Sequence, residues 1–211
     1  MPSSLEKKAA QFARNAHAQI DQRRKYTGQP YIVHPQAVAE LVRHVSEDDN
    51  LLAAAWLHDT LEDTATTFRQ LYRSFGKEVA LLVSMLTNPP AREQDGRQKR
   101  KQRQLQHYLH ASPQAQTIKL ADIIDNTRDV VDNDPVFARH YLVEKQIQIF
   151  LLRDGDPQLW ALAEARIRQQ ITRLCQPPYN QSAAGFRQLT EQYLTAQLRD
   201  CLPTRHYYVE K

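Results

Sequence analysis

The chain has 211 residues, of which 41% are apolar, and a formal net charge of +4. This size fits one domain with at most a short appendage, and the apolar content suffices for a core. No segment approaches the roughly 20 apolar residues of a membrane span, and the N-terminus lacks the apolar stretch of a secretion signal. Cys175 and Cys201 fit neither a disulfide framework nor a zinc motif, so we expect a cytoplasmic protein.

Helix-favouring residues dominate the composition, which includes only 5 glycines and shows almost no alternation of apolar and polar residues. We therefore predict an all-α fold, a globule of several helices. In chain order, apolar spacing and capping residues predict helices over residues 4–20, 35–44, 50–63, 68–74, 79–86, 114–131, 135–153, 157–175 and 183–201.

Short polar motifs and prolines set these limits. Ser3 and Glu6 have the spacing of a capping box, and Gly76 ends the helix over 68–74. Between the first two helices, Pro30 precedes a connector over residues 31–35 that we predict to be extended. Three helices are predicted to start at Ser112-Pro113, Asp134-Pro135 and Asp156-Pro157. The pair Pro177-Pro178 predicts a main domain over 1–176 and a C-terminal helical appendage over 177–211.

Positive charge is concentrated in the polar stretch 92–103, predicted to be a loop or the exposed start of a helix. Six basic minus two acidic residues give this stretch a net charge of +4, equal to that of the whole chain. Such a local field suits a phosphate-rich ligand or a nucleic acid, although a solvated helix face has the same pattern.

The segment 57–63 carries a cluster of possible metal ligands behind an apolar run. On one helix, His58 and Glu62 would share a face, and so would Asp59 and Asp63. Three carboxylates at a helix C-terminus oppose the helix dipole, which indicates a functional site. His58 and Asp59 would project about 100° apart, so other elements must complete the ligand shell of an ion.

A second polar group follows along the chain. Asp122, Asp125, Asn126 and Asp129 recur at helical spacing, which predicts one stripe of three carboxylates and an amide. Like charges at this spacing repel unless a cation lies among them, although a solvated face fits as well. With His34, two histidines and two aspartates would suit Mn²⁺, with Fe²⁺ or Zn²⁺ as alternatives. Such an ion acidifies a water and holds a phosphate oxygen.

Four ordered segments resemble the HD-type hydrolase domain of RelA/SpoT enzymes and of their small free-standing relatives. They are RRKYTGQPYIVHP, AAAWLHDTLEDT, FGKEVALLVSMLT and TIKLADIIDNTRDV, and the similarity covers about residues 9–152. It implies a multi-helix HD-domain phosphohydrolase that removes the 3′-pyrophosphate of ppGpp or pppGpp. Because the chain lacks the length for the synthetase and regulatory parts of the long enzymes, we expect hydrolysis only.

By this resemblance the metal ligands are His34, His58, Asp59 and Asp122, and the ion is Mn²⁺. The resemblance further matches Glu62 and Asp63 to the acidic pair that orients or deprotonates the attacking water.

The resemblance also implies the contacts with a purine nucleotide polyphosphate. Asn126 matches a contact on the ribose side, and either Arg24 or Lys25 matches the basic position at the purine. From the basic stretch, Lys99, Arg100, Lys101 and Arg103 are candidates for neutralising the pyrophosphate. Guanine and adenine alarmones both stay open, because Ile123 and Asp125 replace residues that the family often carries.

Two other functions share some of these features. An HD phosphatase acting on NADPH or a nucleoside monophosphate would use the same metal site and release different products. A non-catalytic nucleotide- or nucleic-acid-binding module would use residues 92–103 and would not need His58 or Asp59. The acidic pair favours an enzyme, and the basic stretch lacks the interleaved aromatic residues of a single-strand nucleic-acid site. A homo-oligomer stays open, and no membrane partner is expected.

Overall fold

The computed structural model describes residues 2–90, 92 and 94–200. Within these ranges every regular element is a helix, so the all-α prediction is confirmed. The helices are α1 (Ser4–Gln19), α2 (Val33–Arg43), α3 (Asp49–Leu57), α4 (Thr60–Asp63), α5 (Phe68–Leu86), α6 (Arg97–Tyr108), α7 (Pro113–Asn126), α8 (Val130–Asn133), α9 (Pro135–Leu151), α10 (Pro157–Cys175), α11 (Ala183–Tyr193) and α12 (Ala196–Asp200). None of the helices found in these ranges is both long and apolar enough to cross a membrane.

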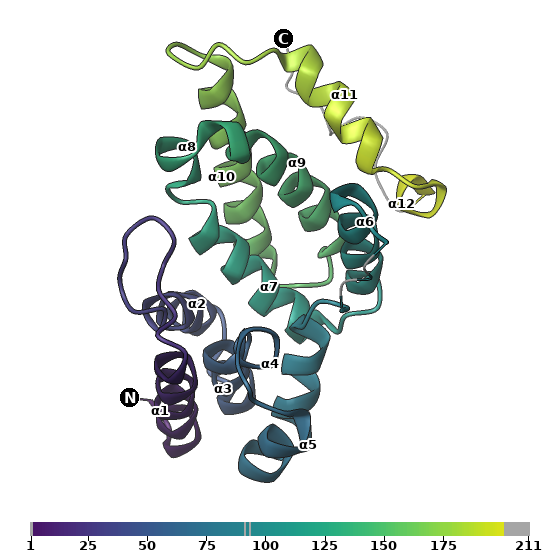
Figure 1. The fold of residues 1–211 in the computed structure, drawn as a ribbon. Coiled ribbons are helices and arrows are strands. Elements are labelled where there is room, and N and C mark those ends of the chain that lie inside the picture. The colour runs from purple at the N-terminus through teal and green to yellow at the C-terminus, as the bar shows by residue number, and fades with distance from the viewer. Residues whose placement is uncertain (1, 91, 93, 201–211) are drawn as a thin grey trace.

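Helix α7 is the centre of the molecule. In Figure 1, α1 to α5 form the lower half, α8 to α12 the upper half, and α7 runs between them. It packs against α2, α3 and α5 on one side and against α10 on the other. Every residue from Ala115 to Asp125 is buried, as expected for a helix enclosed on all sides. Polar side chains of α7 are therefore held rigidly inside the protein.

The predicted helix starts are confirmed where a polar cap precedes a proline. The side chains of Ser112, Asp134 and Asp156 each accept backbone N–H bonds at the start of α7, α9 and α10. The capping box at Ser3 is only half formed. The Ser3 hydroxyl accepts from the Glu6 N–H, but the Glu6 carboxylate turns inward to Arg43 and Trp56, because these donors satisfy a buried charge.

Several predicted helix limits differ from the structure; the helix predicted over 114–131, for example, ends at Asn126. The helices predicted over 68–74 and 79–86 form one element, α5, with a kink at Gly76, whose φ of 87° a residue with a Cβ adopts only under strain. The helix predicted over 183–201 is broken between α11 and α12, because Leu194 is extended and the Thr195 hydroxyl caps the next helix. Residue 201 lies outside the described ranges.

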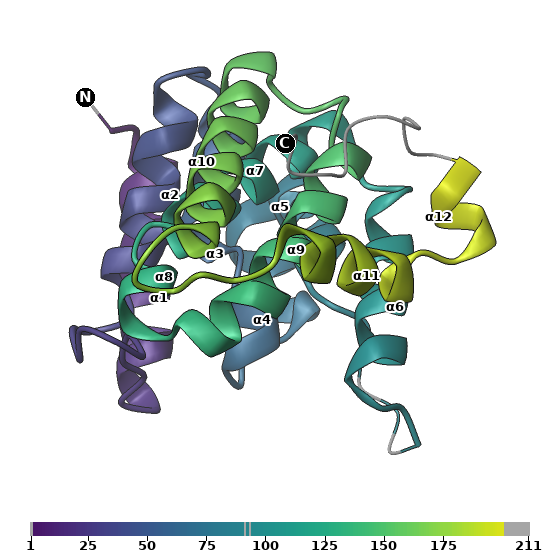
Figure 2. The ribbon, with the colours of Figure 1, turned by 90° about the horizontal axis from the view of Figure 1, so that it is seen from above.

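The C-terminal helix α11 packs against α9 and α6, and Figure 2 shows it crossing in front of both. The basic stretch is thus held by a helix from the far end of the chain: Gln98 and Gln102 both donate to the carbonyl of Gln192. The boundary predicted at residue 177 falls in the turn between α10 and α11 and stays a prediction.

Gly155, between α9 and α10, leaves no space for a side chain against α7. A Cβ there would lie 2.9 Å from Leu120 Cδ1 and 3.1 Å from backbone atoms of Gln116 and Thr117. G155A should therefore lower the free energy of unfolding by about 1–3 kcal/mol, as overpacking does, measured by urea denaturation. G185A is the matched control. At Gly185 the atoms nearest to an added Cβ are those at the far end of the Arg139 side chain, which is flexible and can move away. Equal destabilisation by both variants would contradict this interpretation.

Candidate active site

His34 lies in the first turn of α2, so the prediction of an extended connector over 31–35 is wrong for residues 33–35. Ile32 already has helical dihedrals, and His34 N–H donates to the carbonyl of Tyr31. Pro35 fits there because the first N–H groups of a helix have no partner within the helix. His34 is completely buried and points from a rigid helix start.

The helix predicted over 50–63 is broken at His58 and Asp59, between α3 and α4. His58 Nδ1 donates to the carbonyl of Ala55 over 2.9 Å, and the Thr60 hydroxyl donates to that of Leu57 over 2.7 Å. These side chains take carbonyls at the end of α3 and compete with continuation of the helix. At this break the ends of the two side chains meet, with His58 Nε2 3.0 Å from Asp59 Oδ2.

Four side-chain atoms from α2, the α3–α4 break and α7 converge. Asp59 Oδ2 lies 3.0 Å from His58 Nε2 and 3.5 Å from His34 Nε2. Asp122 Oδ1 lies 3.1 Å from His34 Nε2 and 3.8 Å from His58 Nε2. Atoms that each lie about 2.0–2.2 Å from a shared ion are separated by such distances. The ligand atoms of His34, His58 and Asp59 all lie within 4.8 Å of one another, and Asp122 is outside this group of three.

Both imidazoles are held in the form that binds a metal. His34 Nδ1 is 2.7 Å from Asp125 Oδ2, and His58 Nδ1 donates to the Ala55 carbonyl. These acceptors hold the proton on Nδ1 and leave Nε2 free. Both Nε2 atoms are buried without a hydrogen bond, so a divalent ion fits the residues present.

Asp122 is placed by α7 and by a buried lysine. Its Oδ2 pairs with Lys119 Nζ at 2.7 Å, and its Oδ1 accepts from Asn126 Nδ2 at 2.5 Å. Burial alone would raise the pKa of the Asp122 carboxyl, but Lys119 and the two imidazoles hold it well below its usual range. Asp122 therefore stays charged inside the protein, ready to bind a cation.

The charges around the histidines also balance one another. Burial would lower the pKa of His34, but Asp122, Asp125 and Asp59 raise it well above its ordinary value. The pKa of Asp59 is well below its usual range, since the imidazoles outweigh the effect of burial. A bound metal cation would compete with a proton for His34 Nε2.

The predicted stripe on α7 is only partly formed. Asp122, Asp125 and Asn126 are on the helix, but Asp129 is not, because α7 ends at Asn126 and Asp129 precedes α8. The Thr127 hydroxyl donates to the Ile123 carbonyl over 2.7 Å at this helix end. Asp129 instead lines the aromatic pocket described below.

Glu62 and Asp63 lie on α4, beyond the break, and point to different partners. Glu62 accepts from both the N–H and the Nδ2 of Asn88 at 3.0 Å. Asp63 Oδ2 accepts from Gln22 Nε2 at 2.8 Å. Loss of surrounding water, together with the nearby charges of Asp59 and Glu62, raises the pKa of the Asp63 carboxyl against the effect of Gln22.

A basic cavity of about 580 Å³ opens beside Glu62, between α4, the residues after α5 and α6. Among the described residues, Glu62 is the one acidic residue that lines it, and its basic lining residues are Arg97, Arg100, Lys101 and Arg103. Lys99 is exposed and does not line this cavity, because it projects from another side of α6. Arg103 also pairs with Asp95 at 2.6 Å.

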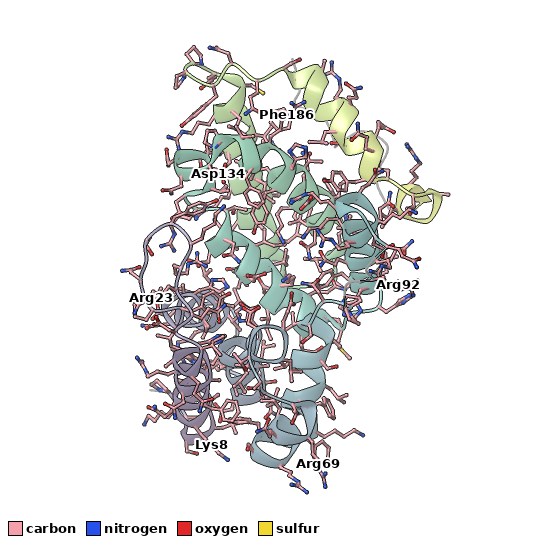
Figure 3. The ribbon with its side chains drawn as sticks, in the orientation of Figure 1. Lys8, Arg23, Arg69, Arg92, Asp134 and Phe186 are labelled. Carbon is pink, nitrogen blue, oxygen red and sulfur yellow. The ribbon has the colours of Figure 1, made fainter. Side chains whose placement is uncertain are left out.

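An aromatic pocket of about 170 Å³, lined by Tyr26, Phe137 and Tyr141, adjoins Asn126. Arg24 lies at its inner side, where it donates to Asn126 Oδ1 at 2.8 Å and to Asp125 Oδ2 at 3.2 Å. Lys25 lies at the rim. Its partner is Asp134, which Figure 3 shows above the loop that carries Arg23. Lys25 donates to Asp134 at 3.1 Å and lies over the rings of Tyr26 and Phe137.

Several contacts in the site were not predicted. The Tyr31 hydroxyl donates to Asp59 Oδ2 at 2.6 Å, and Lys119 and Asn88 hold Asp122 and Glu62. Lys119 lies three residues before Asp122 on α7, a spacing that would have indicated an internal ion pair. Nothing local marks Tyr31 or Asn88, because their partners are 28 and 26 residues away.

Substitution of Asp125 tests whether the hydrogen-bond acceptor of His34 Nδ1 affects metal binding. D125A removes the acceptor for His34 Nδ1, so the imidazole is no longer held in the form that binds a metal. We expect Mn²⁺ affinity, measured by titration calorimetry, to fall about 10- to 100-fold. D125N retains an acceptor oxygen and should lose less. An unchanged affinity in D125A would remove Asp125 from this role.

Residues 9–151 match the family model described as HD domain, a region that ends with α9. The guanosine-3′,5′-bis(diphosphate) 3′-pyrophosphohydrolase MESH1 of Xenopus tropicalis is 41% identical over 125 residues, 58% of this chain and 67% of that protein. The protein of the same name from Homo sapiens is 42% identical, with the same coverage.

A solved structure is also similar. Its title describes a metazoan ortholog of SpoT that hydrolyzes ppGpp and plays a role in starvation responses. It is 31% identical, and the superposition has a TM-score of 0.71, covering 81% of this chain and 97% of the other.

Proposed function

This chain belongs to the HD domain family, and we propose that it is a metal-dependent hydrolase that removes the 3′-pyrophosphate of a purine alarmone, (p)ppGpp or (p)ppApp. The products are pyrophosphate and the nucleoside di- or triphosphate. One observation carries the chemistry: two buried imidazole nitrogens without hydrogen bonds face two carboxylate oxygens. The names of the relatives supply the substrate class.

We assign His34, His58, Asp59 and Asp122 as the residues that hold the ion. Mn²⁺ is our choice for this mixed set of nitrogen and oxygen donors, with Fe²⁺ or Zn²⁺ as alternatives. When bound, the ion supplies charge neutralisation for the phosphoryl group and acidifies a water. Tyr31 and Lys119 hold the two carboxylates in place.

Glu62 and Asp63 form the acidic pair that orients the attacking water and accepts its proton. Asn88 and Gln22 fix the two carboxylates without neutralising their charge. The raised pKa of Asp63 makes it a better proton acceptor than an ordinary aspartate.

The substrate would lie across both cavities. The aromatic pocket suits a flat purine, with Arg24 at its inner side, Lys25 at its rim and Asn126 toward the ribose. The basic cavity suits phosphates, with Arg103 among its lining residues. Lys99 is left out of this assignment. We place the reaction in the reducing cytoplasm, in keeping with a cysteine spacing in the sequence that fits no disulfide framework.

The test is release of pyrophosphate and phosphate, with Mn²⁺ and after chelation, from ppGpp, ppApp, NADPH and nucleoside monophosphates. We expect pyrophosphate from an alarmone, lost on chelation. If phosphate is released only from NADPH or a nucleoside monophosphate, the proposed metal centre stands and the proposed substrate class is wrong. No turnover by the ion-loaded protein would overturn the enzymatic function.

A further inference from the structure

Three lysines from three helices line a small cavity behind Asp122. Lys101 comes from α6, Lys119 from α7 and Lys145 from α9, around a space of about 40 Å³. Asn88, Lys101 and Gln104 also line the basic cavity beside Glu62. The small cavity therefore adjoins the larger one and extends it toward α9.

One carboxylate oxygen in this cavity is engaged by partners outside the cavity lining. Glu144 is the only acidic residue in the described lining. Its Oε1 accepts from Arg97 at 3.0 Å and from the Tyr193 hydroxyl at 2.8 Å, and its Oε2 is buried without a hydrogen bond. Lys101 Nζ is 3.8 Å from the other oxygen of Glu144, beyond hydrogen-bond distance. Lys119 is paired with Asp122.

Lys145 is the group left without a counter-ion. Its Nζ donates to Gln148 Oε1 at 2.9 Å and lies 5.1 Å from the centre of the Tyr141 ring. It forms no ion pair with any described residue. Burial, together with the charges of Lys119 and Lys101, lowers the pKa of Lys145 to about 7. A half-buried cation among cations is unfavourable until an anion joins it.

The position of Lys145 relates it to the aromatic pocket. It follows Tyr141, a wall of that pocket, by one helical turn of α9. The cavity has room for roughly three water-sized groups, which matches phosphate oxygens and excludes a base. An anion here would lie on the same face of α9 as a purine bound against Tyr141.

We propose that Lys145 and Lys101 form a phosphate subsite for the phosphate group of the substrate that is not hydrolysed. This inference rests on the proposed function. It assigns the metal centre to the scissile 3′-pyrophosphate and the lysine cavity to phosphate on the 5′ side. Arg97 and Tyr193 act as positioning residues that hold Glu144 by its Oε1.

The experiment has two readouts in the full-length chain. Inorganic pyrophosphate is titrated into metal-free wild type, K145M and K145R, and the KM and kcat for ppGpp are measured with Mn²⁺. K145M should weaken pyrophosphate binding and raise the KM by about 10-fold or more, as for loss of a charge-assisted hydrogen bond. Its kcat should stay near that of wild type, and K145R should retain both properties.

K77M is the matched control, since Lys77 is exposed on α5 and should leave both readouts unchanged. Pyrophosphate binding and KM unaffected in folded K145M would overturn the subsite and leave the proposed function standing. Pyrophosphate binding lost in K145M, without alarmone turnover by wild type, would support an anion subsite and overturn the proposed function.

Discussion

Replacing Asp59 with alanine should abolish hydrolysis and weaken Mn²⁺ binding by more than about 100-fold, the upper range for losing a partner behind a ligand. Asp59 Oδ2 is the carboxylate oxygen nearest His58 Nε2, and it also faces His34. Without it, the only remaining carboxylate ligand is Asp122, whose charge Lys119 already offsets. Calorimetry with Mn²⁺ measures the metal affinity, and release of pyrophosphate from the preferred alarmone measures hydrolysis.

Two variants complete this experiment. D59N keeps the shape of the side chain and removes its charge, so it should also lose both properties. D132A removes an exposed carboxylate that pairs with Arg173 on the surface and should retain both. Turnover by D59A at a tenth of the wild-type rate or more would remove Asp59 from the metal centre.

The variants E62Q and D63N should each lower kcat by about 10²- to 10⁴-fold, the range for a positioned acid or base, without loss of Mn²⁺ affinity. Neither carboxylate is among the proposed metal ligands. Glu62 accepts hydrogen bonds from Asn88, and Asp63 accepts one from Gln22. Single-turnover kinetics with saturating Mn²⁺ separates the chemical step from binding of the metal.

N88A tests whether the position of Glu62 matters. This variant keeps the carboxylate but removes the side-chain donor that holds it, so we expect a smaller loss of kcat than in E62Q. If E62Q instead loses Mn²⁺ with its activity, then Glu62 serves the ion and the acidic pair is wrongly assigned.

The sequence alone determined the features that depend on residues close together in the chain. Helix starts at Ser112, Asp134 and Asp156 follow from a polar cap that accepts a backbone N–H and a proline that needs no partner. The resemblance carried by four short motifs indicated the family that the match over residues 9–151 then established. It also singled out His34, His58, Asp59 and Asp122, which the fold brings together.

Tertiary structure decided where helices end and what lies behind the ligands. The break after Leu57 depends on the His58 and Thr60 side chains taking backbone carbonyls, a competition that helical periodicity cannot resolve. The contacts from Tyr31 to Asp59 and from Asp125 to His34 join residues 28 and 91 positions apart.

The lysine cavity is a tertiary feature as well. Lys101, Lys119 and Lys145 come together only in the folded chain, where α6 packs against α9 and all three side chains line one cavity. In the sequence these lysines are separated basic residues on three helices. Their burial and mutual repulsion, which give Lys145 its unusual pKa, exist only in the folded chain.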